Sequence, residues 1–189
     1  MQETVVLSTQ PIALRRTLAV VLGTALVAAA AQVSVPLPGT PVPMTLQPLA
    51  VLLVGGLLGA RLGAASLALY LALGAAGLPV FTPTVPLVGV ARLFGPTGGY
   101  LLAYPVAAFA VGAIAGDGRQ WGGTRVALGV LAGLALIHLG GLAQLAILTG
   151  DLSAAARFGT LPFLLGDLGK LAIAVLVLTR FTSSVRARL

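Results

Sequence analysis

The chain has 189 residues, of which 58% are hydrophobic and only 8% are charged, and its formal net charge is +7. Its mean hydropathy of +1.08 lies outside the range of soluble globular domains and indicates an integral membrane protein. The absence of cysteine excludes disulfides, thiolate metal sites and cysteine nucleophiles. The basic residues are spread thinly along an apolar chain, so we interpret them as topology signals rather than as a nucleic-acid surface.

Six apolar runs, separated by segments rich in Pro, Gly, Thr and charge, are predicted to be membrane-spanning helices. Their ranges are about 15–32, 45–60, 62–78, 96–115, 125–148 and 161–181. The first run follows two arginines and ends in "AAAAQ", a combination that also fits a cleavable signal peptide. Because the rest of the chain is equally apolar, a retained first helix is the simpler interpretation. We therefore expect an all-α membrane protein with a single integral membrane domain over 1–189.

The arginines predict the orientation. With a cytoplasmic N-terminus, eight fall in inner segments and two in outer segments: Arg15, Arg16, Arg61, Arg119, Arg125, Arg180, Arg186 and Arg188 against Arg92 and Arg157. This bias predicts that both termini are cytoplasmic. The outer connections 33–47 and 78–100 are long, proline-rich and mostly uncharged, which suggests a lid over a cavity at the outer face. Loops that merely lie on the lipid surface are the alternative.

The last apolar run carries Asp167 and the only lysine of the chain, Lys170. A charge near the middle of a bilayer costs on the order of 2.5 to 3.5 kcal/mol, so such residues need a reason to persist. Three residues apart on a helix, the two side chains share one face and offset each other's desolvation cost. We interpret them as a ligand-binding pair, with a structural ion pair between helices as the alternative. The flanking Gly166 and Gly169 would let a second helix or a ligand approach closely.

Two other segments place hydrogen-bonding groups where predicted helices begin. "PVPMTLQP" offers Thr45 and Gln47, and helix capping by Thr45 is the alternative. "GPTGGY" opens the fourth run, where free backbone N–H groups could receive an anion or a carbonyl; a simple junction between loop and helix is the alternative. Arg92, just before this segment, could bind a carboxylate. "GDLGK" lacks the first glycine and the Ser or Thr of a P-loop, so the chain shows no ATPase motif.

Taken in order, the motifs "VPMTLQ", "LLGARLG", "GLPVF", "GPTGGYL" and "LLGDLGK" resemble the BioY family, the biotin-binding S components of energy-coupling factor (ECF) vitamin transporters. The resemblance covers about Arg15 to Arg180. It implies a six-helix substrate-binding subunit in a prokaryotic plasma membrane, which works with a transmembrane coupling protein and two cytoplasmic ATPases. The expected protein is not an enzyme and has no cofactor or metal of its own, since biotin is the transported ligand and the partners use ATP.

By this resemblance the biotin pocket lies toward the outer face and is formed by Thr45, Gln47, Arg92, Thr97, Gly98, Gly99, Tyr100, Asp167 and Lys170. Asp167 would accept hydrogen bonds from the ureido N–H groups, Lys170 would donate to the ureido carbonyl, and Arg92 would bind the carboxylate. Exchanging the roles of lysine and arginine satisfies the same charges. The chain reads "TPTVPLVGVARL" where the family usually has a glycine-rich stretch, and it contains no asparagine, which leaves the role of Arg92 open.

In the first run, Ala25 and Ala29 form a small-x-x-x-small pair that permits close helix contact. S components are known for such an interface with the coupling protein, so the resemblance implies that these two alanines lie at it.

Two other functional classes compete with this interpretation. The first is an ion-coupled secondary transporter of a small carboxylate-bearing solute, with Asp167 as the ion site; the sequence shows no internal repeat and only one acidic residue clearly within a span. The second is an intramembrane enzyme, but the only histidine, His138, has no serine motif beside it. His138 and Gln144 are the remaining polar residues of the fifth run, and we interpret His138 as a hydrogen-bonded helix contact rather than as a proton relay.

Overall fold

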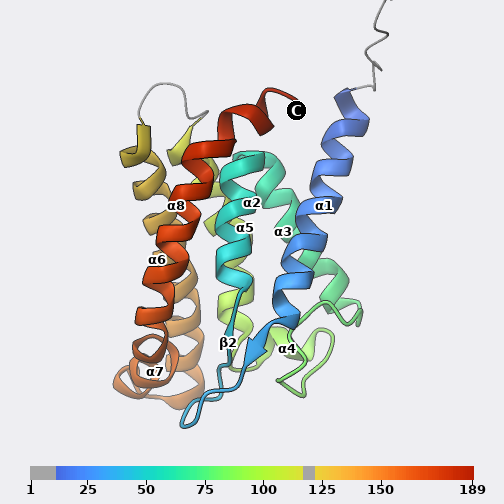
Figure 1. Cartoon of the computed structure of the whole chain (residues 1–189). Coiled ribbons are helices and arrows are strands. Elements are labelled where there is room, and N and C mark those ends of the chain that lie inside the picture. Colours follow the sequence, from blue (N-terminus) through green and yellow to red (C-terminus); the bar gives the residue numbers. More distant parts are fainter. Residues whose placement is uncertain (1–11, 117–121) are drawn as a thin grey trace, which may run out of the picture.

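Helices make up most of the chain (Figure 1). The computed structural model describes residues 12–116 and 122–189. The helices are α1 (Ile12–Gln32), α2 (Gln47–Leu58), α3 (Ala60–Ala75), α4 (Ala91–Phe94), α5 (Gly98–Ala115), α6 (Gly122–Thr149), α7 (Leu152–Gly159), the 3-10 turn η1 (Leu161–Phe163) and α8 (Leu164–Arg186). Within these residues, the only strands are β1 (Ser34–Val35) and β2 (Met44–Thr45), an antiparallel pair with Ser34 opposite Thr45. This short hairpin was not predicted.

Four segments of the described chain are long and apolar enough to cross a membrane: 12–32, 98–115, 123–149 and 152–186. The helices α2 and α3 are also apolar but have only 12 and 16 residues, or about 18 and 24 Å at 1.5 Å per residue. They occupy the places of the second and third predicted spans. The chain is thus built as a multi-pass membrane protein.

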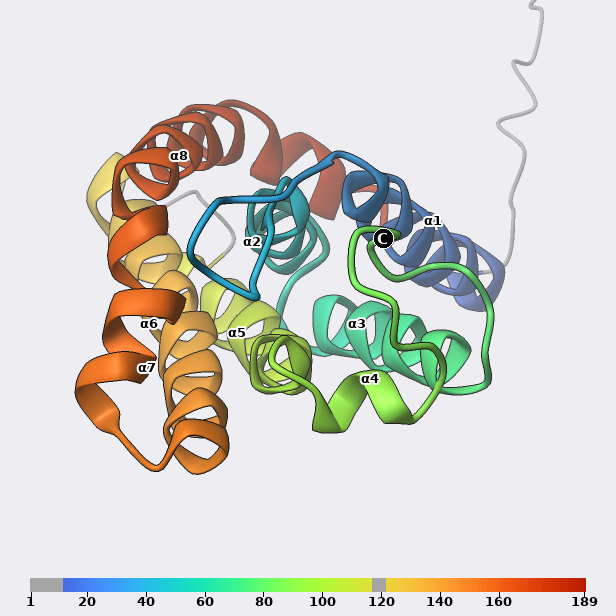
Figure 2. The ribbon, with the colours of Figure 1, turned by 90° about the horizontal axis from the view of Figure 1, so that it is seen from below.

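The helix α2 lies in the middle of the bundle, with α1, α3, α5 and α8 around it (Figure 2). Its sequence "QPLAVLLVGGLL" is apolar on every side, which is typical of a helix buried by neighbours all round. Val51 and Leu52 have no exposed surface. The outer helices instead expose large apolar side chains, such as Ile147 and Leu165, which are 82% and 86% exposed. These side chains are suited to contact lipid.

Glycines allow the central helices to pack backbone against backbone. A Cβ at Gly55 of α2 would overlap the backbone of Ala108 in α5, and one at Gly112 of α5 would overlap the backbone at Gly59. Gly59 itself has φ = 83° and is the single residue between α2 and α3. A positive φ favours glycine, so this residue permits the tight connection predicted at "GARLG".

The bundle has two distinct ends (Figure 1). One end carries the beginnings of α1, α3 and α6 and the end of α8, and we call it the arginine-rich end. The other, the hairpin end, carries β1, β2, α4 and α7. Arg92 and Arg157 belong to the hairpin end. The arginine-rich end carries Arg15, Arg16, Arg61, Arg125, Arg180, Arg186 and Arg188. Arg119, which the orientation prediction counted with these residues, lies outside the described residues.

Short elements that the sequence did not indicate cover the hairpin end. The amphipathic helix α7 begins after Asp151, whose carboxylate accepts a hydrogen bond from the backbone N–H of Ser153 at 2.7 Å. The hydroxyl of Thr40, between β1 and β2, donates to the carbonyl of Phe158 in α7 at 2.7 Å. The hairpin and α7 are thereby joined over the ends of the long helices.

Candidate functional site

A cavity lies within the hairpin end. Ligand pockets typically combine apolar walls with a few placed polar groups. Seven of the predicted site residues line this cavity: Thr45, Gln47, Arg92, Thr97, Tyr100, Asp167 and Lys170. The rest of the wall is formed by Val42, Pro43, Pro48, Phe81, Thr82, Leu101, Tyr104, Ile137, His138 and Phe163. The cavity therefore has the mixed apolar and polar lining of a small-molecule site.

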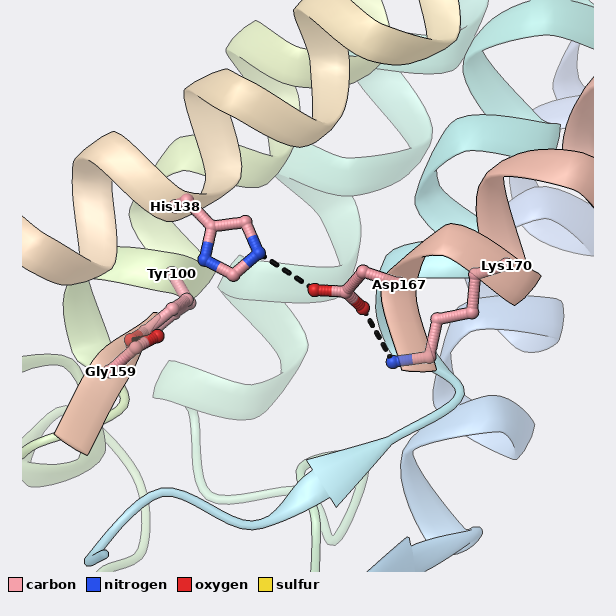
Figure 3. A network of polar contacts seen from close by, with 5 residues as sticks. All are labelled: Tyr100, His138, Gly159, Asp167 and Lys170. Carbon is pink, nitrogen blue, oxygen red and sulfur yellow. Dashed lines mark hydrogen bonds and ion pairs between the residues drawn. The ribbon is translucent and has the colours of Figure 1, made fainter. Parts of the chain in front are cut away.

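Asp167 and Lys170 form an ion pair on the cavity side of α8 (Figure 3). Nζ of Lys170 lies 2.9 Å from Oδ1 of Asp167, and the two residues are only 7% and 3% exposed. Their spacing of three residues places them on one face of the helix, as the sequence predicted. The other carboxylate oxygen, Oδ2, lies 2.7 Å from Nε2 of His138 on α6. Asp167 is thus held from two helices at once.

Tyr100, at the beginning of α5, stands between His138 and α7 (Figure 3). Its ring meets the His138 ring edge to face, with centroids 6.4 Å apart and planes at 79°. Its hydroxyl donates to the carbonyl of Gly159, the last residue of α7, at 2.5 Å. The network therefore runs from α7 through α5 and α6 to the ion pair on α8.

Arg92 of α4 is the other buried cation of the wall, and it is 3% exposed. Its Nη2 donates to the carbonyl of Thr82, and its guanidinium carbon lies 5.9 Å from the centre of the Phe81 ring. Nε and Nη1 are buried and have no hydrogen-bond partner. Burial lowers the pKa of Arg92, because a cation held away from water is disfavoured. This arrangement suits an anionic ligand group.

The two polar residues at the beginning of α2 are already engaged. The Thr45 hydroxyl accepts the backbone N–H of Gln47 at 3.2 Å, so Thr45 both lines the cavity and binds the first turn of the helix. The Gln47 amide donates to the Tyr70 hydroxyl at 2.7 Å, and that hydroxyl donates to the carbonyl of Val80 at 3.2 Å. These bonds join α2, α3 and the connection that follows α3. Gln47 therefore has a structural role beside its place in the wall.

The glycines of "GPTGGY" lie at a close contact between helices. Gly98 and Gly99 are not part of the cavity wall. A Cβ at Gly99 would overlap the carbonyl of Gly140 in α6, and one at Gly98 would overlap the carbonyl of Leu93. Small residues here let α5 approach α6, so these glycines meet a packing requirement. The side chain of Gln144 in α6 completes this contact between α5 and α6.

The Gln144 amide donates to the carbonyls of Leu93 and Gly95, at 3.0 and 2.7 Å. Thr97, beside this junction, lines the cavity, and its hydroxyl is buried without a partner. Thr97 is therefore available to a ligand.

Ala25 and Ala29 lie far from this wall, on exposed positions of α1. Gly166 faces the side chain of Met44, whereas a Cβ at Gly169 would meet nothing within 4 Å. No helix within residues 12–116 and 122–189 therefore approaches Gly169 closely.

Sequence reasoning did not place His138, Tyr104, Phe81 and Phe163 at the site. Three of them are aromatic residues in apolar segments, and an apolar pattern does not distinguish a cavity wall from a core. His138 gave a signal as the single histidine within a predicted span. Its contact with Asp167 could not be read from spacing, because 29 residues and a second helix separate the two.

The chain is similar in sequence to known proteins along most of its length. The model of the BioY family matches residues 2–187. A probable biotin transporter BioY from Pyrococcus horikoshii is 44% identical over 161 residues, which cover 85% of this chain and 92% of that protein. The biotin transporter BioY from Thermotoga maritima is 40% identical over 157 residues, covering 83% and 89% of the two chains.

A solved structure also matches the fold. It is the S-component for biotin from an ECF-type ABC transporter, with a TM-score of 0.81 and 26% sequence identity, and the match covers 89% of this chain and 90% of that one. From the family match and these relatives, the chain belongs to the BioY family.

Proposed function

We propose that this protein is the substrate-binding membrane subunit for biotin uptake, which captures biotin at the outer face and delivers it inward with an ATP-driven ECF module. The observation that carries the proposal is a single cavity that combines the Asp167–Lys170 pair with the partly unpaired guanidinium of Arg92. The relatives and the solved neighbour carry names of biotin transporters and of a biotin S-component, not of enzymes.

The polar groups of the cavity match the chemistry of biotin. Biotin has a ureido group with two N–H donors and one carbonyl acceptor, an apolar thioether ring, and a carboxylate at the far end. Asp167 offers acceptor positions to the ureido N–H groups, and Lys170 has further N–H donors for the ureido carbonyl. The aromatic and aliphatic wall, which includes Phe81, Tyr104 and Phe163, suits the thioether ring and the alkyl chain.

Charge supports the same ligand. Arg92, Lys170 and Asp167 leave a net charge of +1 in the cavity when His138 is neutral. A monoanionic ligand brings this charge to zero. Lys170 already neutralises Asp167, whereas two nitrogens of Arg92 have no partner. We therefore assign the biotin carboxylate to Arg92, and the exchange of the two cations is the alternative that a test must separate.

The arginines support an orientation of the protein in the membrane, which we propose is the cell membrane of a prokaryote. With α1, α2, α3, α5, α6 and α8 crossing the bilayer, the arginine-rich end is cytoplasmic together with both termini, in accord with the positive-inside rule. The hairpin end and the cavity then face outward. The short helices α2 and α3 are covered at that end by the outer connections, so their ends need not reach the membrane surface.

The exposed face of α1 suits a contact with the membrane partner of the module. Ala25 and Ala29 lie four residues apart on this face, where small side chains let a second helix come close. We propose that the transmembrane coupling protein docks here and links the subunit to two cytoplasmic ATPases.

Binding and transport test this proposal separately. Isothermal titration calorimetry of the detergent-purified protein should give saturable biotin binding, which Asp167→Asn and Lys170→Ala weaken strongly. Proteoliposomes should take up biotin only when the ECF module and ATP are present. Uptake driven by an imposed ion gradient without the module would instead favour a secondary transporter and overturn the proposal.

A further inference from the structure

His138 makes a contact in the cavity that ligand binding alone does not explain. Its Nε2 lies 2.7 Å from Oδ2 of Asp167, while Lys170 holds Oδ1 at 2.9 Å (Figure 3). Since an ionised carboxylate only accepts hydrogen bonds, Nε2 is the nitrogen that carries the hydrogen in this contact. The two oxygens of Asp167 are therefore fixed by different helices, one by α6 and one by α8.

The imidazole is itself fixed by its surroundings. Tyr100 packs edge to face against it, and the Tyr100 hydroxyl is anchored on the carbonyl of Gly159 at 2.5 Å. Two glycines make room for this ring. A Cβ at Gly141 would overlap the Tyr100 ring, and a Cβ at Gly159 would overlap its hydroxyl. The orientation of His138 is thus set by α5 and α7.

The two contacts, from His138 and from Lys170, restrict the rotation of the Asp167 carboxylate. With a separate donor on each oxygen, the group cannot rotate without losing a hydrogen bond at a position where Asp167 is only 3% exposed. Each carboxylate oxygen has a second acceptor position that stays open for a ligand. Without His138, both oxygens could turn toward Lys170, and the acceptor would no longer have a fixed direction.

We infer that His138 is a positioning residue, which holds Asp167 as an oriented acceptor and thereby selects ligands with an N–H donor at that end of the cavity. The inference rests on the proposed function, because the donor in question is the ureido N–H of biotin. It assigns His138 no contact with the ligand. Its effect passes through Asp167.

Calorimetric titration of four variants tests this role. His138→Leu removes the donor, His138→Asn has a shorter amide, and His138→Gln keeps an amide N–H long enough to reach Asp167. Leu139→Ala is the control, because Leu139 is the next residue of α6 and is 59% exposed. We expect His138→Leu and His138→Asn to bind biotin about two- to tenfold more weakly. This is the cost of ordering the Asp167 side chain when the ligand binds. The Gln variant and the control should bind like the parent.

Ligand selectivity separates positioning from general structural damage. Biotins methylated on one ureido nitrogen should bind the parent much more weakly than biotin does, and His138→Leu should reduce this difference. If His138→Leu weakens all these ligands equally, or none of them, the positioning role is wrong while the proposed function stands. If the parent binds no biotin, the proposed function fails and this inference fails with it.

Discussion

Nζ of Lys170 lies 2.9 Å from Oδ1 of Asp167, its neighbour one turn earlier on α8, and neither residue is more than 7% exposed. A buried ion pair is weak evidence for stability, because desolvation opposes the Coulomb attraction. Removing one partner, in contrast, leaves an uncompensated charge. Removing one partner and removing both should therefore change stability differently. Comparing stability with ligand binding in such variants distinguishes a ligand-binding pair from a structural pair.

Single and double replacements of this pair should therefore behave differently. Asp167→Leu alone should reduce the free energy of unfolding by about 3 to 5 kcal/mol, because Lys170 would stay charged without a partner. Adding Lys170→Met should restore most of that stability but no biotin binding. Thermal unfolding in detergent and calorimetric titration measure the two properties. If the double variant binds biotin like the parent, the pair is structural and not a ligand site.

The assignment of the biotin carboxylate to Arg92 predicts a change in ligand preference. The parent should prefer biotin over its methyl ester, which carries no charge. Arg92→Gln should weaken biotin binding by about 2 kcal/mol, or roughly thirtyfold, and remove this preference. Lys170→Gln is the matched control, because it should weaken both ligands and keep the preference. The opposite pattern in competition binding would assign the carboxylate to Lys170.

The sequence was informative where one helix alone decides the geometry. The spacing of Asp167 and Lys170 predicted their contact, since three residues on a helix give one outcome. The helical segments were located by apolar runs with Pro and Gly between them, although α2 begins at Gln47 rather than Thr45. The short helix α7 was missed, because eight residues with charge and glycine resemble a loop.

Contacts between helices were less accessible to prediction. Gly98 and Gly99 were assigned to the ligand because a glycine-rich helix start exposes backbone N–H groups. The same residues permit close packing against α6, and only the position of Gly140 decides between the two roles. The contact of His138 with Asp167 likewise depends on how α6 and α8 are rotated toward each other.

The exposed alanines of α1 predict a defect in transport without a defect in binding. Ala25→Trp and Ala29→Trp add bulk at exposed positions of α1, so biotin affinity should stay within about twofold of the parent. Uptake by the complete module should fall at least tenfold, since the close helix contact is blocked. The control Leu131→Trp replaces another exposed side chain, on α6, and should transport normally. Normal uptake by both alanine variants would place the partner elsewhere.

The proposed orientation can be tested by labelling, because the chain has no cysteine of its own. Val88, in the connection before α4, is 77% exposed, and Ser184 lies exposed near the end of α8. In intact cells a membrane-impermeant maleimide should label Val88→Cys but not Ser184→Cys. Permeabilised cells should label both, which controls for accessibility. Labelling of Ser184→Cys alone in intact cells would reverse the topology.

Two glycines, Gly99 on α5 and Gly169 on α8, predict opposite effects of adding one methyl group. At Gly99 a Cβ would meet the backbone oxygen of Gly140, which cannot move aside without shifting α6, so Gly99→Ala should cost about 1 to 3 kcal/mol of stability. The change should also displace the adjacent Tyr100 and weaken biotin binding.

Gly169 provides the matched control, because a Cβ there would meet nothing within 4 Å. Gly169→Ala should leave biotin affinity unchanged and raise stability by up to about 1 kcal/mol, since alanine favours the helix over glycine. Thermal unfolding and titration of the two variants side by side measure both effects. Equal loss of stability in both would contradict the packing described for α5 and α6 and the open surroundings of Gly169 on α8.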